Sequence, residues 1–255
     1  MRVISPQEHA PARLAFSTMT GSPTFVLVHG AWHGAWSWAR LGEALDQRNI
    51  PWAALDLPSS QTFDPLVDMM ADVNALHGFA RGRGPVVLVG HSYGGAVVAE
   101  AAPRTPELVG IVHVASLLAR LGQSASDVTK ETRRQGLSSP LDAAIRREDG
   151  LLMLDRALAA PALYGDCDET TRQWAIGRVA TQTLASFRTP RTSPDTSVPT
   201  TYVVCQRDQA IRPELQREIA HDCDHVVELA SDHCPFLSHP QELADLLGAM
   251  DFPTA

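Results

Sequence analysis

One stretch of the chain constrains the fold more than any other. It begins with Val86–Val89, an apolar and β-branched run of strand length, and continues as Gly90-His91-Ser92-Tyr93-Gly94, which has the pattern G-x-S-x-G. The small, apolar residues that follow, Gly95–Ala102, are compatible with a helix. A sharp strand-to-helix turn lifts the serine hydroxyl above the sheet edge, and glycines on either side allow the turn without a Cβ clash. The stretch therefore predicts that Ser92 is a nucleophile, the alternative being an idle serine in a glycine-rich turn.

The size and charge of the chain restrict its class. With 255 residues, 44% hydrophobic and 20% charged, the chain fits one large α/β domain or a core with an insertion, which needs neither disulfides nor metals for stability. The net charge of −8 argues against nucleic acid and anionic membrane surfaces as partners. No apolar run reaches 18 residues, so no transmembrane helix is expected.

Cysteine usage and the first residues bear on the compartment. The four cysteines contain no C-x-x-C pair and are expected to be free thiols in a reducing cytosol: Cys167, Cys205, Cys223 and Cys234. Residues 1–22 lack the features of a signal peptide and are expected to form a loose arm. A cytoplasmic protein is therefore predicted, as a monomer or homodimer. The single lysine, Lys130, among abundant arginine and alanine suggests a bacterial coding sequence.

Apolar segments alternate with helical patterns along the chain. Helices are predicted over Trp36–Gln47, Pro65–Ala80 (with Leu66 on its apolar stripe), Pro213–Ala220 and Pro240–Met250. The predicted strands are Phe25–His29, Pro51–Leu55, Val86–Val89, Val109–Ala115, Thr200–Cys205 and Val226–Leu229. Because each strand is apolar throughout, we predict a doubly wound, mainly parallel six-stranded sheet covered on both faces.

The segment 116–199 shows no convincing strand. Helical patterns occur at Leu141–Leu158 and Glu169–Phe187, before a linker rich in proline, serine and threonine at Thr189–Pro199. An insertion at this place would lie over the carboxyl edge of the sheet, where open α/β sheets bind ligands. We therefore predict a core of residues 23–115 and 200–255 with a helical cap of residues 116–199.

Two further residues complete a catalytic set. A serine nucleophile needs a general base that is itself oriented by a carboxylate, in the order Ser, Asp/Glu, His, each just past a strand end. Asp208 follows the strand Thr200–Cys205, and His233 follows the strand Val226–Leu229. Asp232 adjoins His233 directly and is expected to be a turn residue.

Other polar groups of the chain have ordinary structural explanations. His29 and His91 are expected to be packed, hydrogen-bonded histidines. The metal-like run His221-Asp222-Cys223-Asp224-His225 is expected to be a polar turn, because adjacent residues cannot all face one ion. An oxyanion needs two backbone N–H donors, predicted at Tyr93, after the nucleophile, and at Ala31, with Trp32 the next candidate.

These residues resemble those of the α/β-hydrolase fold superfamily, in the branch of plant methyl-ester esterases and hydroxynitrile lyases and their bacterial relatives. The matching segments are FVLVHGAWHGAWSW (Phe25–Trp38), ALDLP (Ala54–Pro58), VGHSYGG (Val89–Gly95), CQRDQAI (Cys205–Ile211) and SDHCPFLSHPQEL (Ser231–Leu243). The resemblance implies the same roles: Ser92 as nucleophile, His233 as base, Asp208 as its orienter, with Ala31 and Tyr93 donating to the oxyanion. It implies no cofactor and no metal.

Two departures from the branch bear on the reaction. The lyases have a threonine where Gly30 stands and a lysine directly after the catalytic histidine, where this chain has Cys234. The predicted activity is therefore hydrolysis of a small-molecule carboxylic ester through an acyl-enzyme. Lactone or thioester hydrolysis, C–C lyase activity and a ligand-binding receptor remain alternatives. The candidate pocket walls, which favour hydrophobic or aromatic esters, are Trp32, Leu163, Trp174, Phe236 and Leu237.

Overall fold

The computed structural model describes residues 22–134 and 136–252, so the predicted N-terminal arm lies, except for its last residue, outside the described residues. A six-stranded sheet in the order β2-β1-β3-β4-β8-β9 forms the centre, and every neighbouring pair in it is parallel. Its strands are β1 (Thr24–Val28), β2 (Trp52–Leu55), β3 (Val86–His91), β4 (Leu108–Val114), β8 (Thr200–Cys205) and β9 (His225–Leu229). The predicted six-stranded parallel sheet is confirmed, and its inner strands are buried on both faces. The edge strand β9 differs, since its residues are exposed or half-buried and Val226 is 50% exposed.

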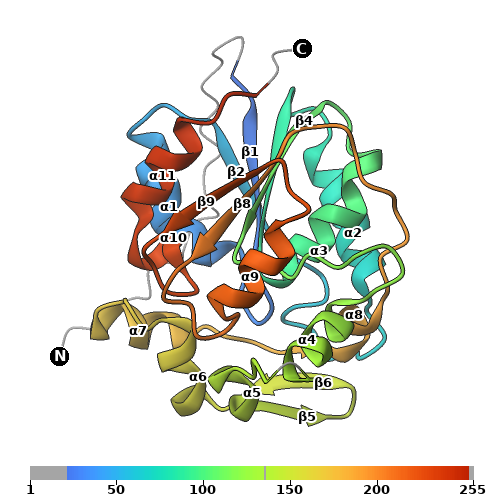
Figure 1. Ribbon diagram of the computed structural model, residues 1–255, viewed down its shortest axis with the longest axis vertical. Helices are drawn as coiled ribbons and strands as arrows, with labels where there is room; N and C mark the ends of the chain where they lie inside the picture. Colours follow the sequence, from blue (N-terminus) through green and yellow to red (C-terminus); the bar gives the residue numbers. More distant parts are fainter. Residues whose placement is uncertain (1–21, 135, 253–255) are drawn as a thin grey trace, which may run out of the picture.

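Helices cover both faces of the sheet (Figure 1). On one side lie η1 (Ala35–Trp38), α1 (Ala39–Asp46), α10 (Pro235–Ser238) and α11 (Pro240–Gly248); on the other lie α2 (Met69–Ala80), α3 (Tyr93–Ala101), η2 (Ala102–Arg104) and α9 (Pro213–Ala220). The helix predicted from Pro65 begins only at Met69, because the Asp68 carboxylate caps it by accepting from the Met70 and Ala71 amides. Leu66 consequently lies outside the helix and is 83% exposed.

The segment 116–199, which we predicted to be a cap, lies across the carboxyl edge of the sheet (Figure 1). It contains α4 (Ala125–Arg134), α5 (Pro140–Ala144), β5 (Ile145–Glu148), β6 (Leu151–Leu154), α6 (Arg156–Leu163), α7 (Glu169–Ile176), β7 (Gln182–Thr183) and α8 (Leu184–Arg188). The expectation of a purely helical segment was wrong, since β5, β6 and β7 form a three-stranded sheet. Asp149 and Gly150 have φ of 48° and 80°, which gives the tight hairpin turn that Asp-Gly favours.

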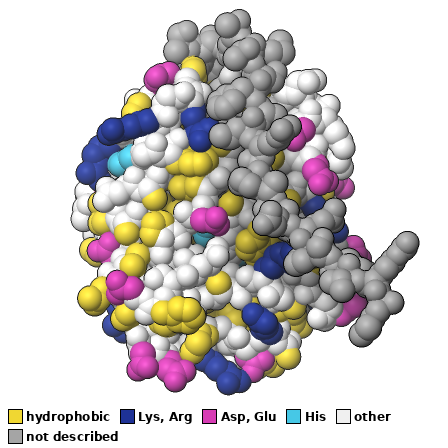
Figure 2. Space-filling model, turned by 180° about the vertical axis from the view of Figure 1, so that it is seen from behind, with side chains coloured by type: hydrophobic (Ala, Val, Ile, Leu, Met, Phe, Trp, Pro, Cys, Tyr) yellow, Lys and Arg dark blue, Asp and Glu magenta, His cyan; other side chains and the backbone are white. Residues whose placement is uncertain are grey.

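The described surface carries charges of both signs. Figure 2 shows acidic and basic side chains interspersed among apolar ones on the rear face, without a continuous basic area over the part drawn in colour. Among the described residues, no helix is long and apolar enough to cross a membrane. The four cysteine thiols are free.

Candidate active site

Ser92 occupies a strained turn between β3 and α3. Its φ of 52° and ψ of −121° are rare for a residue with a side chain, a conformation that costs about 1–3 kcal/mol and persists only where the surroundings enforce it. Here the first turn of α3 lies directly on the backbone of the neighbouring strand. A Cβ on Gly94 would be 2.5 Å from the Val28 carbonyl oxygen, so only glycine fits there. The predicted elbow therefore forms, with Ser92 9% exposed.

Asp208 and His233 lie at the ends of β8 and β9 and meet, as the sequence predicted. The Nδ1 of His233 lies 2.7 Å from Oδ2 of Asp208, and both side chains are buried. The His233 ring packs on His91, the residue before Ser92, with ring centroids 4.5 Å apart, and His91 Nε2 donates to the His233 carbonyl at 2.9 Å. His91 is thus a packed histidine that fixes the His233 loop beside the elbow.

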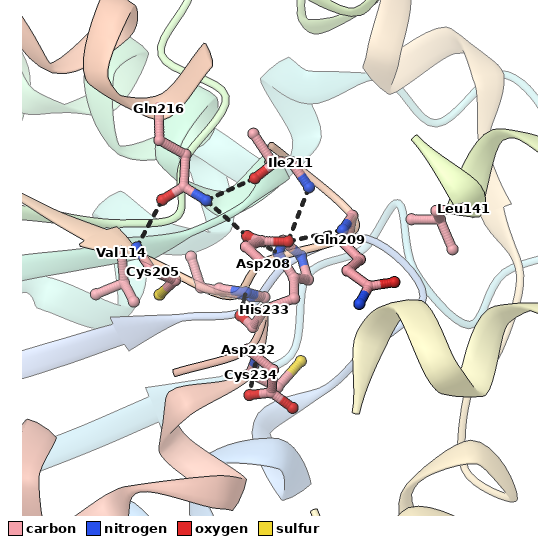
Figure 3. A network of polar contacts seen from close by, with 12 residues as sticks. Val114, Leu141, Cys205, Asp208, Gln209, Ile211, Gln216, Asp232, His233 and Cys234 are labelled. Atoms are coloured by element: carbon pink, nitrogen blue, oxygen red, sulfur yellow. Dashed lines mark hydrogen bonds and ion pairs between the residues drawn. The ribbon is translucent and has the colours of Figure 1, made fainter. Parts of the chain in front are cut away.

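A ring of donors surrounds the Asp208 carboxylate (Figure 3). Its Oδ1 accepts from the amides of Ala210 and Ile211 at 2.7 and 2.9 Å, and its Oδ2 accepts from Gln216 Nε2 at 2.8 Å beside the His233 contact. Gln216 also donates to the Ile211 carbonyl and accepts from the Cys205 amide. Sequence reasoning missed Gln216, because one glutamine in a helix has no spacing that marks it. It holds Asp208 against the strand end.

The loop after β1 presents one open amide. His29 Nε2 accepts from the Leu57 amide, so its Nδ1 carries the proton and donates to the Gly30 carbonyl at 2.8 Å. The Trp32 amide donates to the Gln182 side chain at 3.4 Å. Within residues 22–134 and 136–252, no acceptor binds the Ala31 amide. The geometry therefore favours Ala31 over Trp32 as an oxyanion donor.

The second amide predicted for the oxyanion belongs to Tyr93, the first residue of α3, whose N–H has no intrahelical acceptor. Its side chain is anchored: the Tyr93 hydroxyl donates to Asp72 at 2.6 Å, and Ser59 donates to the same carboxylate through its hydroxyl and its amide. Burial raises the pKa of Asp72 to about 6 and the pKa of Tyr93 well above its usual value. Asp72 is a second residue that sequence reasoning missed, since it looked like an ordinary helix acid.

Burial disfavours the charged form of three histidines around the elbow, His29, His33 and His91. Desolvation lowers the pKa of His33 to about 3, and lowers the pKa of His29 and of His91 as well. A neutral ring carries one donor and one acceptor nitrogen, which is what the contacts of His29 and His33 require. These rings therefore act as hydrogen-bonding parts of the scaffold at neutral pH.

The candidate pocket residues divide into two groups. Trp32 and Leu163 are buried where cap meets core, and the Trp32 indole donates to the Leu152 carbonyl of β6 at 3.0 Å. Phe187 of α8 stacks on Tyr93, with ring centroids 5.0 Å apart, and lies 6.1 Å from the Trp32 ring. Trp32, Tyr93 and Phe187 thus form an aromatic cluster beside the elbow, in which Phe187 was not predicted.

The other three candidates have different surroundings. Phe236 is fully buried between Trp38 and His91, with ring centroids 4.5 and 4.8 Å away, and Leu237 beside it in α10 is equally buried. Trp174 packs on Trp36 at 5.3 Å. These contacts are core and cap packing, and a role for them in substrate binding remains a prediction.

One polar cluster and one cavity involve residues other than Ser92, Asp208 and His233. Asp166, Asp232 and His239 lie close together, but the Arg207 guanidinium already donates to Asp166 at 2.7 and 2.9 Å. Asp232 accepts from backbone amides, as expected of a turn residue. A cavity of about 340 Å³ lies between α3, α4 and α9, and Ser92, Asp208 and His233 are not among the residues that line it.

Comparison with known proteins identifies the family. Residues 25–246 match the model of the alpha/beta hydrolase family. The chain belongs to this family. This α/β hydrolase is 27% identical to methyl jasmonate esterase 1 of Vitis vinifera, over 88% of this chain and 94% of that protein. It is 25% identical to alpha/beta hydrolase nvfD of Aspergillus novofumigatus, over 86% and 92%.

A solved structure supports the fold. The pyrethroid hydrolase of Sphingobium faniae JZ-2 superposes with a TM-score of 0.79 at 22% identity, covering 89% of this chain and 96% of that one. The predicted superfamily and fold are confirmed. A bacterial origin, suggested by composition, is not borne out, since the relatives compared above at the sequence level come from a plant and a fungus.

Proposed function

We propose that this α/β hydrolase cleaves carboxylic esters through Ser92, His233 and Asp208. The observation that carries the proposal is the buried contact of 2.7 Å between His233 Nδ1 and Asp208 Oδ2, next to an elbow that presents Ser92. Since His233 Nδ1 donates to the carboxylate, Nε2 is left with a lone pair that can accept the serine proton. Relatives named as esterases support the same reaction.

The reaction proceeds in two halves. Ser92 Oγ attacks the ester carbonyl while His233 Nε2 takes its proton, and the oxyanion accepts from the Ala31 and Tyr93 amides. His233 then protonates the leaving alcohol, which departs and leaves an acyl group on Ser92. Water, deprotonated by His233, attacks this acyl-enzyme, and the acid is released as His233 returns the proton to Ser92.

Two features favour hydrolysis over a hydroxynitrile-lyase reaction. Cys234, which stands where the lyases have lysine, is fully buried, and a cysteine side chain cannot carry the positive charge of a lysine. Burial raises the pKa of its thiol well above the usual value, so the thiol also stays protonated and neutral. At Gly30, a Cβ would lie 2.9 Å from the Ser92 Cβ, so the threonine of the lyases would crowd the nucleophile. The cluster of Trp32, Tyr93 and Phe187 supports a hydrophobic ester as substrate.

The test is replacement of the nucleophile. Ser92→Ala should abolish hydrolysis of p-nitrophenyl esters and labelling by a serine-directed phosphonate, because no other group can form the acyl-enzyme. Ser126→Ala, in the cap helix α4, serves as the matched control and should keep both. Unchanged turnover in Ser92→Ala would contradict the proposal. Tight binding of an ester without turnover by the unaltered protein would point to a receptor, and cyanide release from mandelonitrile to a lyase.

A further inference from the structure

We propose that Tyr164 and Gln182, two side chains of the cap, are positioning residues that clamp the Ala31–Trp32 peptide and thereby set the oxyanion hole. The inference rests on the proposed function and goes beyond it, because it gives the cap a part in the chemical step as well as in substrate choice. Neither residue reaches the reacting atoms directly. Each acts on one side of the same peptide group.

The first side of the clamp holds the carbonyl of Ala31. Tyr164, at the end of α6, places its hydroxyl 2.8 Å from His33 Nε2, and His33 Nδ1 lies 2.8 Å from the Ala31 carbonyl oxygen. A carbonyl can only accept, so Nδ1 carries the ring proton and Nε2 must accept from the Tyr164 hydroxyl. Both side chains are essentially buried, so no competing solvent contact relaxes this relay. The cap thus fixes the tautomer and the direction of the His33 ring.

The second side of the clamp holds the amide of Trp32. Gln182, in β7, accepts from this amide at 3.4 Å and from the Ser60 hydroxyl at 2.6 Å. Its amide nitrogen donates to the hydroxyls of Ser59 and Ser186 at 2.7 and 2.8 Å. All of these contacts are buried, and together they use both ends of the Gln182 side chain. The side chain therefore cannot rotate without losing several buried hydrogen bonds, each of which is costly to leave unmade.

The clamped peptide needs such support because of its conformation. Trp32 has a φ of 63°, in the left-handed region that is a genuine outlier for a bulky side chain. The N–H of Ala31 lies on the preceding peptide, Gly30–Ala31, whose Gly30 carbonyl accepts from the His33 backbone amide at 3.3 Å. His33 therefore holds both peptides that meet at the Ala31 Cα, one through its ring and one through its amide, and the direction of the Ala31 N–H depends on His33 staying in place. An oxyanion-hole donor stabilises the transition state because its N–H already points at the developing negative charge. A small rotation of this N–H therefore weakens its hydrogen bond to the transition state more than its hydrogen bond to the bound ester.

The experiment compares Tyr164→Phe and Gln182→Leu with Thr181→Val. Thr181 is a matched control, since its hydroxyl also ties the cap to the core, at 2.7 Å from the Thr62 carbonyl, but does not contact the loop after β1. We expect the two test variants to lose about 10-fold to 100-fold in kcat, below the loss that follows removal of a whole donor, with KM nearly unchanged. Thr181→Val should keep wild-type kcat.

A thionoester provides the readout that a merely structural role would not move. Its sulfur accepts N–H hydrogen bonds poorly, so the ratio of ester to thionoester turnover reports on the oxyanion hole. This ratio should fall in Tyr164→Phe and Gln182→Leu, whereas loss of folded protein would lower both rates alike. An unchanged ratio in Tyr164→Phe, with an active wild type, would overturn the clamp and leave the proposed function standing.

Amide hydrogen exchange tests the clamp without any substrate. Exchange in the peptide spanning Phe25–Trp36 should accelerate in Tyr164→Phe and stay at the wild-type rate in Thr181→Val, because only the former releases His33 from the cap. A wild type that cleaves no ester would overturn the proposed function, while this measurement would still decide whether the cap holds the loop. Equal exchange in all variants would refute the clamp.

Discussion

The buried carboxyl of Asp72 gives a prediction about stability and pH. It lies behind the Tyr93 side chain, has no exposed surface, and accepts from Ser59 and Tyr93, while burial and the nearby charge of Asp68 raise its pKa from 3.8 to about 6. The unfolded chain therefore releases the Asp72 proton at lower pH than the folded chain does. Between pH 4 and pH 6 the folded state binds more protons, so the contribution of Asp72 to stability falls as the pH rises.

The size of the effect follows from the two pKa values. A difference of roughly two pKa units corresponds to about 3 kcal/mol of unfolding free energy. In Asp72→Asn, an uncharged amide of the same shape can bond the same hydroxyls, so this loss disappears. As the pH rises from 3.5 to 7, we expect the unfolding free energy of the variant to increase relative to that of the wild type by up to about 3 kcal/mol.

Urea unfolding of both proteins across this pH range provides the measurement, since subtracting the two curves removes the effect of the other carboxylates. Glu148→Gln, which removes an exposed carboxylate of β5, is the control for the loss of one negative charge. A difference curve for Asp72→Asn that does not exceed the curve of this control would refute the reasoning that burial dominates the Asp72 carboxyl.

Two other substitutions test the elbow and the support of the acid. Gly94→Ala should destabilise the fold by about 1–3 kcal/mol, because its Cβ would meet the rigid Val28 carbonyl. Gly78→Ala, in the open part of α2, should stabilise the fold by about 0.5–1 kcal/mol. Thermal unfolding measures both variants, and equal unfolding midpoints would contradict the close contact between Gly94 and Val28. Gln216→Leu leaves the Asp208 carboxylate without one hydrogen-bond donor. On a p-nitrophenyl ester, kcat should fall by a larger factor than KM changes. A wild-type kcat would show that Gln216 does not position Asp208.

The core of the fold could be predicted because its signals are local. Each buried parallel strand is a short apolar run, and the residues directly after those runs share one edge of the sheet. Asp208 and His233 could thus be placed together although 25 residues separate them, and their contact has the expected form. Ser92 followed from the glycines that its turn requires.

The cap and the supporting polar residues could not be predicted in the same way. In β5 the residues Arg146, Arg147 and Glu148 are exposed and charged, so no apolar alternation marks the strand, and only the Asp-Gly turn after them signals a hairpin. Gln182 contacts Trp32, which lies 150 residues earlier in the chain. Such a contact depends on how the cap packs on the core, and no periodicity in the sequence encodes it.

The order of strands in the sheet also has a consequence for how the enzyme is made. β4 and β8 are neighbours, with Ile111 paired to Thr200, yet the whole cap is translated between them. A nascent chain can therefore complete the elbow while the acid and the base are still unsynthesised. Two members of the proposed triad arrive with the last two strands, so a ribosomal product that stops before Thr200 would carry Ser92 with no means to activate it. Catalytic competence is delayed until almost the entire polypeptide has been made.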